Sequence, residues 1–417
     1  MATFLLFGIT GDLARNKIVP ALFNLYARKE VNQNHFICIG VGRKKIQKEE
    51  FHNLISESIA AVSIANFKDR LDITSSDIET FRHNFVLSCM YIQGEFNDPR
   101  LYSEIKKDLE ISMLSSKDNA IFCKLSLPPS LHSDIVGHLI DGKIMSIRSF
   151  NLLIEKPFGS DASSARKLFN KITEKLDPKH LILIDHYLGK EPVIDLENIR
   201  LSGYGESLLS SKNIKEVEVR LLEIKSIGTR GAFYDQVGAL QDVGQNHLLQ
   251  VLAVAVADYS DIRELDTAKS VFIGSLRFDS RQKAIFGQYK GYLKELHVNP
   301  ESKTETFFSV GFKSNLKKWA KTKFRVTSGK CMQNALAEII YTYTDGKKFS
   351  LRISEKGRSA YEYILLGALH HNVMLRADIQ QIIASWKLTA EVKKHQNSKN
   401  VEFMVYEKNT NSILKLI

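Results

Sequence analysis

The stretch Phe4-Leu5-Leu6-Phe7-Gly8-Ile9-Thr10-Gly11-Asp12-Leu13-Ala14 decides how the first half of the chain folds. Its apolar start ends at a glycine, and an apolar helical pattern continues through Ile18, Leu22 and Leu25. Residues 36–40 are a second short apolar run. This succession predicts a strand, a glycine turn, a helix and a second strand.

Three later segments repeat the strand pattern. Residues 119–127 stop at Pro128-Pro129, residues 151–154 end at Glu155, and residues 181–184 lead into Asp185. Strands that alternate with helices favour a parallel sheet with helices on both faces. We therefore expect an α/β, Rossmann-like, doubly wound parallel sheet as a nucleotide-binding domain over residues 1–185.

The pattern changes after residue 185. Residues 242–257 read as a long amphipathic helix. We expect further strands at 304–312, 324–327, 338–343 and 348–353, and helices at 360–367 and 377–386. Helices beside a mostly antiparallel sheet predict a C-terminal α+β domain over residues 186–417.

Composition excludes several classes of protein. The 417 residues carry a formal net charge of +11, but the lysines are scattered and accompany no nucleic-acid motif, so we expect no nucleic-acid partner. The longest apolar stretch, 248–257, is too short to span a membrane. The four cysteines form no C-x-x-C pair, which favours neither a metal site nor disulfides and fits the reducing cytoplasm.

The glycine turn is a candidate dinucleotide site. Its spacing, G-x-x-G-x-x-A, lets a pyrophosphate approach the helix N-terminus, and the alternative is a plain strand–helix turn. We assign the cofactor contacts to Gly8, Thr10, Gly11, Asp12 and Leu13. After the second strand stands Arg43, where an NAD enzyme usually has an acid, so the residue favours the 2′-phosphate of NADP. The alternative for Arg43 is an exposed loop cation.

The segment Ile184-Asp185-His186-Tyr187-Leu188-Gly189-Lys190-Glu191 is the strongest functional signal. A core helix has no need of an acid, an imidazole, a phenol and a lysine so close together. A site that grips an anion and orients a catalytic base does. Histidine titrates near neutrality and therefore suits the role of such a base. For His247, the residues alone favour a hydrogen-bonded histidine on the core face of a helix.

These motifs resemble the glucose-6-phosphate dehydrogenase family across nearly the whole chain. The resemblance rests on residues 184–191 and on three further segments in the same order. They are Leu153-Ile154-Glu155-Lys156-Pro157-Phe158-Gly159, Gly228-Thr229-Arg230-Gly231-Ala232-Phe233-Tyr234-Asp235 and Gln241-Asp242-Val243-Gly244-Gln245-Asn246-His247-Leu248-Leu249-Gln250. Shorter matches include Leu127-Pro128-Pro129, Thr304-Glu305-Thr306-Phe307 and Gly329-Lys330.

The resemblance implies a role for each matched residue. His247 would be the catalytic base, and Asp185 would orient it and stabilise the imidazolium. The substrate would be held by these residues: Lys156, His186, Tyr187, Lys190, Glu223, Asp242 and Lys330. Lys17 and Lys156 would also meet the coenzyme. Pro157 matches a family proline that is usually cis.

The chain departs from the family pattern at several positions. Gln241 replaces a usual Arg, Ala335 replaces a basic residue that contacts the substrate, and Thr327 and Leu336 replace other cations, so we expect no structural NADP. Between Arg352 and Ala360 the family usually has a long stretch of the second sheet, and here it is short. That sheet builds the dimer contact in relatives, so a homo-oligomer stays an open expectation.

The expected activity is NADP-dependent oxidation of β-D-glucose 6-phosphate at C1 to 6-phospho-D-glucono-1,5-lactone, the first step of the oxidative pentose phosphate pathway. Two alternatives stay open. The first is a dehydrogenase for a related hexose phosphate, such as an amino-sugar phosphate, which Gln241 and Ala335 motivate. The second is a catalytically weak NADP-binding regulatory homologue, against which the intact Asp185, Lys190 and His247 speak.

Overall fold

The chain divides into two compact units. The computed structural model describes residues 2–67, 72–114, 119–202, 209–257, 259, 264–355, 357–371, 376–398, 401 and 403–417. Unit 1 comprises Met1–Ser160, Ser164–Ile184 and Gly357–Arg376, and unit 2 comprises Asp161–Ser163, Asp185–Lys356 and Ala377–Ile417. The assignment of 1–185 and 186–417 as separate functional domains stays a prediction.

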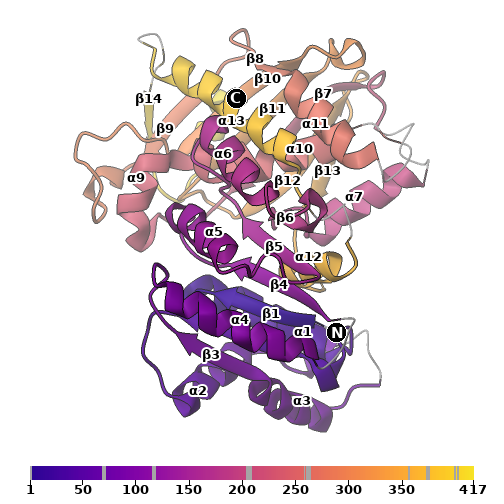
Figure 1. The fold of residues 1–417 in the computed structure, drawn as a ribbon. Coiled ribbons are helices and arrows are strands. Elements are labelled where there is room, and N and C mark those ends of the chain that lie inside the picture. Colours follow the sequence, from indigo (N-terminus) through magenta and orange to yellow (C-terminus); the bar gives the residue numbers. More distant parts are fainter. Residues whose placement is uncertain are drawn as a thin grey trace. The chain divides into compact units, whose positions relative to one another are not determined.

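Unit 1 is built on a six-stranded, all-parallel sheet (Figure 1). Its strands are β1 (Ala2–Phe7), β2 (Ile37–Gly42), β3 (Cys89–Gln93), β4 (Ala120–Leu125), β5 (Phe150–Glu155) and β6 (Leu181–Ile184). Its helices are η1 (Ala14–Ile18), α1 (Val19–Ala27), α2 (Lys48–Ile59), α3 (Ser75–Leu87), α4 (Pro99–Leu114), α5 (His132–Asp141), α6 (Ala162–Thr173) and α12 (Ala360–Leu369). Short 3-10 turns are η2 (Gln33–His35), η3 (Ile64–Phe67), η4 (Pro129–Leu131) and η5 (Pro178–His180).

The strand order of unit 1 places a binding edge beside β1. The order is β3-β2-β1-β4-β5-β6, so the chain winds first to one side of β1 and then to the other. In such sheets ligands bind at the carboxyl ends of the strands, at the point where the winding direction switches. The predicted doubly wound parallel sheet is confirmed, and Gly8 follows β1 at that point.

Unit 2 holds an eight-stranded mixed sheet in the order β13-β12-β7-β11-β10-β9-β14, with β8 paired to β10. Its strands are β7 (Ile214–Leu222), β8 (Leu276–Phe278), β9 (Ile285–Tyr289), β10 (Phe307–Ser314), β11 (Lys323–Gly329), β12 (Leu336–Tyr343), β13 (Lys348–Arg352) and β14 (Phe403–Tyr406). Its helices are α7 (Glu191–Leu201), α9 (Gly231–Ala239), η7 (Leu240–Leu248), α10 (Leu249–Val256), α11 (Leu265–Ser275) and α13 (Ile379–Gln396). Short 3-10 turns are η6 (Gly228–Arg230), η9 (Tyr292–Lys294), η10 (Lys317–Trp319) and η12 (Ser412–Leu416).

The pairing within this sheet is mostly antiparallel, as expected. Only β7–β11 and β9–β14 run parallel among the described strands. Strand alternation gives the sheet two different faces, because successive side chains point to opposite sides. On β7, Val217, Val219 and Leu221 belong to the hydrophobic core, whereas Glu218 and Arg220 alternate with them.

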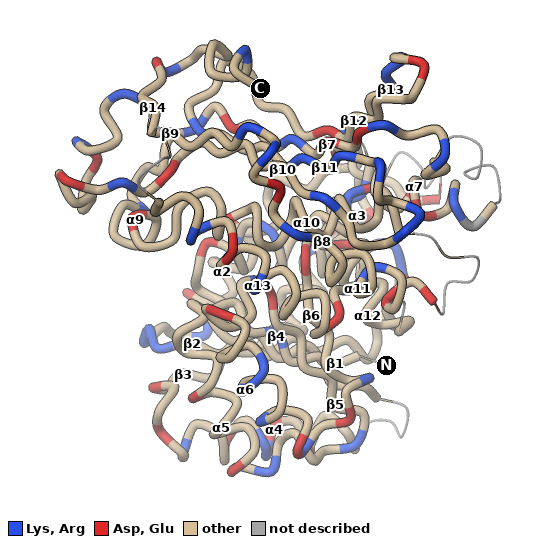
Figure 2. Tube along the Cα trace, turned by 90° about the horizontal axis from the view of Figure 1, so that it is seen from above, with Lys and Arg blue, Asp and Glu red and all other residues tan. Residues whose placement is uncertain are grey.

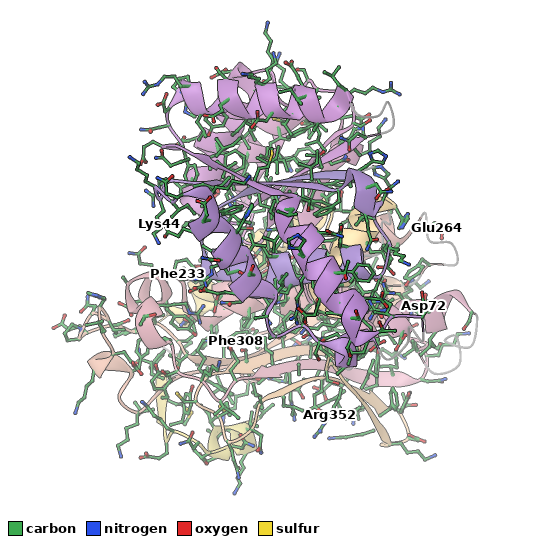
Figure 3. The ribbon with its side chains drawn as sticks, turned by 90° about the horizontal axis from the view of Figure 1, so that it is seen from below. Lys44, Asp72, Phe233, Glu264, Phe308 and Arg352 are labelled. Atoms are coloured by element: carbon green, nitrogen blue, oxygen red, sulfur yellow. The ribbon has the colours of Figure 1, made fainter. Side chains whose placement is uncertain are left out.

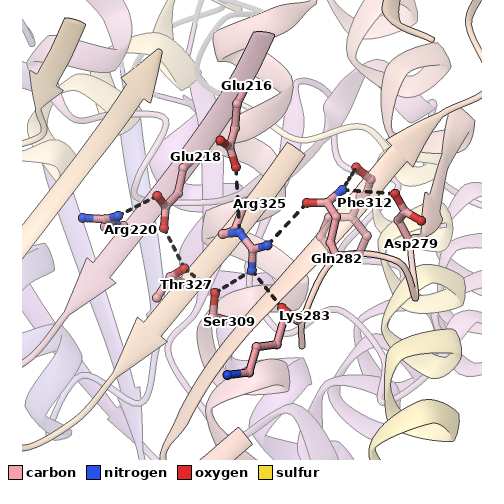
Figure 4. Close-up of polar contacts among 10 residues, drawn as sticks. All are labelled: Glu216, Glu218, Arg220, Asp279, Gln282, Lys283, Ser309, Phe312, Arg325 and Thr327. Atoms are coloured by element: carbon pink, nitrogen blue, oxygen red, sulfur yellow. Dashed lines mark hydrogen bonds and ion pairs between the residues drawn. The ribbon is translucent and has the colours of Figure 1, made fainter. Parts of the chain in front are cut away.

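The polar face of the sheet is tied together by a hydrogen-bonded network (Figure 4). Glu218 accepts hydrogen bonds from Arg220 at 2.7 Å and from the Thr327 hydroxyl at 2.9 Å. Arg325 donates to Ser309 Oγ at 3.1 Å and to the Lys283 carbonyl at 3.2 Å. The network joins β7, β11 and β10 to the β8–β9 connection, so buried polar groups of this face have partners.

Two expected elements differ in detail from the structure. Residues 242–257 do not form one α-helix, because Leu240–Leu248 is a π-helix that continues into α10. The strand expected at 304–312 begins only at Phe307, since the Glu305 side chain turns to the start of η7 and accepts from the Leu240 N–H. The other expected strands and helices are present with ends shifted by a few residues, and α13 is longer.

Charges are distributed along both units. Figure 2 shows Lys and Arg interspersed with Asp and Glu along the Cα trace. Among the described residues, no helix combines the length and apolar character that crossing a membrane requires. In the same residues, no group of three or more His, Cys, Asp or Glu side chains is placed to hold a metal ion.

One buried carboxyl in unit 2 lies outside the expected site. Glu197 on α7 is fully buried, and neither carboxyl oxygen has a hydrogen-bond partner among the described residues. Burial raises its pKa to about 8, Lys269 opposes this shift, and Asp266 adds to it. The folded protein therefore keeps a proton on Glu197 at pH values where the unfolded chain releases it.

Glu197→Gln should flatten the pH dependence of stability. Because the pKa rises from 4.5 to about 8 on folding, the contribution of Glu197 is fully present below about pH 4.5. It is lost as pH rises towards 8, at about 1.4 kcal/mol per pH unit. Melting temperatures between about pH 5 and 8 should fall more steeply for the wild type than for the variant. Asp195→Asn, exposed on the same helix, is the matched control, and parallel curves would contradict the assignment.

Candidate active site

A buried carboxylate–imidazole pair forms the centre of the site in unit 2. Asp185 directly follows β6, and His247 lies on η7. Asp185 Oδ1 is hydrogen-bonded to His247 Nδ1, and the Tyr187 backbone N–H donates to the same oxygen at 3.0 Å. Both residues are only 2% exposed. An Asp side chain that accepts from the backbone two residues on is a stable local turn, so the sequence itself fixes this carboxylate.

The helix that carries His247 has an unusual geometry. Leu240–Leu248 is π-helical, and such segments frequently occur at functional sites. The Phe308 ring packs closely against this helix at Gly244. A Cβ on Gly244 would lie 2.8 Å from the ring of Phe308, which Figure 3 labels. Because a π-helix has more residues per turn than an α-helix, different side chains share a face of it. A prediction based on α-helical spacing therefore assigns these faces incorrectly.

Glu305 holds the start of this helix. Its Oε1 accepts from the Leu240 N–H at 2.8 Å, and its Oε2 accepts from Gln396 at 2.9 Å. Gly238 has φ 72°, and a Cβ there would lie 2.4 Å from Glu305 Oε1, so glycine is required. Burial raises the pKa of Glu305, while the bonds from Gln396 and Leu240 oppose that shift.

Aromatic rings surround the imidazole of His247. The centroid of its ring lies 4.3 Å from that of His186 and 4.4 Å from that of Tyr187. Lys190 Nζ lies 5.6 Å from the Tyr187 ring centroid. Burial raises the pKa of Tyr187, and the carboxylates of Glu223, Asp185 and Glu355 raise it further. The Tyr187 hydroxyl is therefore a neutral hydrogen-bonding group at ordinary pH.

Two further ion pairs in unit 2 involve three more of the expected site residues, Lys330, Glu223 and Asp242. Lys330, 2% exposed, pairs with Glu223 at 2.5 Å, and its Nζ lies 5.4 Å from the Tyr234 ring centroid. Burial raises the pKa of Tyr234, and Asp242 is the largest of the charged contributors. Asp242 itself lies 3.9 Å from the guanidinium of Arg230. Arg230 thus supplies a cation near Asp242, while the neighbouring position 241 is Gln.

The expected cofactor turn in unit 1 combines a tight bend at Gly8 with an open backbone at Gly11. Gly8 has φ 79°, and a Cβ there would lie 2.5 Å from the Ser126 carbonyl oxygen. A Cβ on Gly11 would meet only the Gly8 carbonyl, at 3.2 Å, so the backbone there is open to close approach. Thr10, Asp12 and Leu13 lie on the same turn, and the helical segment that follows begins with η1. These residues fit a dinucleotide phosphate.

Two of the basic residues expected near the cofactor, Arg43 and Lys156, follow the carboxyl ends of unit 1 strands, and the third, Lys17, lies on a helix. Arg43 is exposed directly after β2, its guanidinium lies 5.8 Å from the Phe96 ring centroid, and its carbonyl accepts from Gln93. Lys17 is exposed on η1. Lys156 follows β5, and the Lys156–Pro157 peptide is cis. Arg43 and Gly8 follow neighbouring parallel strands, β2 and β1, at one edge.

Sequence analysis named the expected site residues, but it did not name Glu355 or Gln396, and it missed three relations between residues of the site. It did not predict the cap of η7 by Glu305, the Lys330–Glu223 pair, or a pair between Lys190 and Glu355 at 2.5 Å. Each joins residues more than 60 positions apart. The match at Thr304-Glu305-Thr306-Phe307 was the one available signal for Glu305.

Comparison with known proteins assigns both halves of the chain to one family. A model described as glucose-6-phosphate dehydrogenase, NAD binding domain, matches residues 5–195, and one for the C-terminal domain matches residues 203–355. The Leuconostoc mesenteroides glucose-6-phosphate 1-dehydrogenase is 28% identical over 93% of this chain and 82% of that protein. A Schizosaccharomyces pombe protein, named probable glucose-6-phosphate 1-dehydrogenase, is 30% identical over 82% of this chain and 73% of its own length.

Solved structures show the same fold. A glucose-6-phosphate 1-dehydrogenase from Mycobacterium avium has a TM-score of 0.81 and 25% identity, covering 98% of this chain and 94% of that one. A glucose-6-phosphate dehydrogenase in complex with glucose-6-phosphate has a TM-score of 0.86 and 23% identity, covering 99% and 96%.

Proposed function

The chain belongs to the glucose-6-phosphate dehydrogenase family, and from this premise we propose that it oxidises β-D-glucose 6-phosphate at C1 to 6-phospho-D-glucono-1,5-lactone, with NADP as coenzyme. The observation that carries the proposal is the buried pair of Asp185 and His247, with Lys190 and Lys330 in the same cluster. The pair supplies a base, and the lysines supply charge for a phosphate.

His247 is the proposed catalytic base. Because Nδ1 is bonded to the Asp185 carboxylate, it carries the proton of the neutral imidazole, and Nε2 is left as the proton acceptor. Removal of the C1 hydroxyl proton at Nε2 creates an imidazolium, which the Asp185 charge stabilises. Bound NADP would supply the hydride acceptor that oxidation at C1 requires.

The sugar phosphate would be held by the groups around this base. Lys190, His186 and Tyr187 present an ammonium, an imidazole and a neutral phenol, which can all bond to phosphate oxygens. Glu223 and Asp242 carry carboxylate oxygens that can accept hydrogen bonds from sugar hydroxyls. Lys330 belongs to the same group of residues, because it forms an ion pair with Glu223. In unit 1, Lys156 and Lys17 are the proposed basic contacts at the coenzyme edge.

The coenzyme proposal rests on the turn after β1 and on Arg43. The tight turn at Gly8 and the open backbone at Gly11, with Thr10, Asp12 and Leu13, suit the pyrophosphate. A guanidinium after β2 suits a 2′-phosphate better than the ribose diol of NAD. All four cysteines are free and buried, and we propose the reducing cytoplasm as the location.

A substrate panel tests the proposal directly. Purified protein is mixed with NADP or NAD and with glucose 6-phosphate, glucose, an amino-sugar phosphate or another hexose phosphate, and coenzyme reduction is followed by absorbance. The proposal requires the highest kcat/KM for glucose 6-phosphate with NADP. A higher value for the amino-sugar phosphate would favour the related dehydrogenase, and no reduction with any sugar would favour a binding role alone.

His247→Asn should remove the base while leaving the amide able to hydrogen-bond. General-base catalysis contributes about 10²–10⁴-fold to rate, so kcat should fall by at least that order while KM changes little. Turnover and KM for glucose 6-phosphate are the measurements. Near-normal turnover would rule out His247 as the base.

Asp185→Asn should keep the shape of the pair but remove the charge facing the imidazole. The loss in kcat should be smaller than for His247→Asn. Without the carboxylate, protonation of the imidazole becomes harder, so the acidic limb of the kcat/KM profile should move to lower pH. A limb that moves upward would contradict the pairing.

Arg43→Ala should weaken NADP far more than NAD. Losing a charge-assisted bond to phosphate costs roughly 1.5–3 kcal/mol, or one to two decades in affinity. Dissociation constants for both coenzymes provide the comparison. Lys44→Ala is the matched control, because Lys44, labelled in Figure 3, already pairs with Glu50 at 3.5 Å. Equal losses for the two coenzymes would mean that Arg43 does not bind the 2′-phosphate.

A further inference from the structure

The lysine proposed to bind the substrate phosphate already has a carboxylate partner. Lys190 Nζ lies 2.5 Å from Glu355 Oε1, a hydrogen-bonded ion pair within unit 2. The Lys190 side chain is 19% exposed and that of Glu355 is 39% exposed. Solvent screens this pair only in part, so the carboxylate neutralises much of the charge that Lys190 offers.

Glu355 belongs to the charge environment of the site. It is one of the three carboxylates that raise the pKa of Tyr187, after burial, Glu223 and Asp185. The Lys190 ammonium in turn lies over the ring of Tyr187. Glu355 therefore acts on the same two side chains that are proposed to hold the phosphate.

The second lysine of the site shows the same pairing. Lys330 has the Glu223 carboxylate at 2.5 Å. Residue 335, where the family pattern has a positively charged residue that contacts the substrate, is an exposed alanine here. Each carboxylate of this cluster thus has a basic partner. Glu355 pairs with Lys190, Glu223 with Lys330, Asp242 with Arg230 and Asp185 with His247.

We propose that Glu355 is a specificity-determining residue: its carboxylate competes with the substrate phosphate for the ammonium of Lys190 and so limits the preference for a phosphorylated over an unphosphorylated sugar. The inference rests on the proposed function and deepens it. Glu355 lies three residues after the end of β13, in the segment between Arg352 and Ala360 that distinguishes this chain from the family pattern.

Electrostatics decides the sign of the effect. An ammonium has three donors, so a phosphate oxygen and Glu355 could both bond to Lys190. Two such acceptors would lie only about 4–5 Å apart, and a phosphate carries close to two negative charges at neutral pH. Repulsion between like charges at that separation opposes joint binding. The Lys190 ammonium also lies 5.6 Å from the Tyr187 ring centroid, so Glu355 is not the only group that faces it.

Glu355→Gln tests the competition, because the amide keeps the size and the hydrogen-bonding oxygen but loses the charge. Steady-state kinetics of the full chain are measured with glucose 6-phosphate and with glucose. The KM for glucose 6-phosphate should fall roughly three- to ten-fold, with kcat and the KM for glucose nearly unchanged. In a Lys190→Ala background the same substitution should have no such effect, since the contested ammonium is gone.

Glu407→Gln is the matched control. Glu407 pairs with Lys290 at 2.7 Å in the same unit, and both side chains are 68% exposed. Its substitution removes one negative charge without touching Lys190, so it separates competition at the ammonium from a change in net charge. A fall in KM of equal size in this control would overturn the proposal.

Other kinetic results for Glu355→Gln would show that Glu355 orients Lys190 and does not compete for it. If Glu355→Gln raises the KM for glucose 6-phosphate, or shifts the two sugars equally, the carboxylate orients Lys190 and the proposal is wrong. Failure of the proposed function is a separate outcome, in which no variant reduces NADP. Binding of glucose 6-phosphate and of inorganic phosphate, measured by calorimetry, then decides. Tighter binding in Glu355→Gln supports competition, and equal or weaker binding overturns it.

Discussion

The hydrogen bond between Asp185 and His247 is the interaction on which the site in unit 2 depends. It joins the residue that follows the last strand of the parallel sheet to a helix 62 positions later. Burying an aspartate is costly unless its charge is bonded, and the Tyr187 N–H and the imidazole both serve this purpose. The same bond fixes which imidazole nitrogen faces the carboxylate, and thereby which one is left to accept a proton.

That bond requires a helix placed accurately at its N-terminal end. Glu305 bonds to the first residue of η7 and to Gln396 on α13, and it leaves no space for a side chain at position 238. Phe308, three residues further on, packs at Gly244 in the middle of the same helix. One short segment of unit 2 therefore supports the helix of His247 at two points. Groups fixed in this way need little rearrangement to stabilise developing charge.

Much of this arrangement could be predicted from the sequence. The apolar runs ending at Gly8 and Asp185 located strands of the parallel sheet, since their short length and the turn residues beside them favour a strand over a helix. Local patterns did not predict the π-helical turn at Leu240–Leu248, because an amphipathic stretch is read with α-helical spacing. Glu355 could not be recognised either, because its meaning comes from a partner 165 positions earlier in the chain.

Electrostatic balance explains why so many charges can lie together around His247. Lys330 is almost fully buried, and a buried ammonium is tolerated only with a close counter-charge, which Glu223 supplies. A cluster balanced in this way is stable by itself, but it has less unmatched positive charge with which to attract a dianion. If Lys190 binds the phosphate as proposed, stability of the cluster and affinity for the phosphate oppose each other there. Under this proposal the short segment after β13 sets that balance, because Glu355 places a negative charge at Lys190.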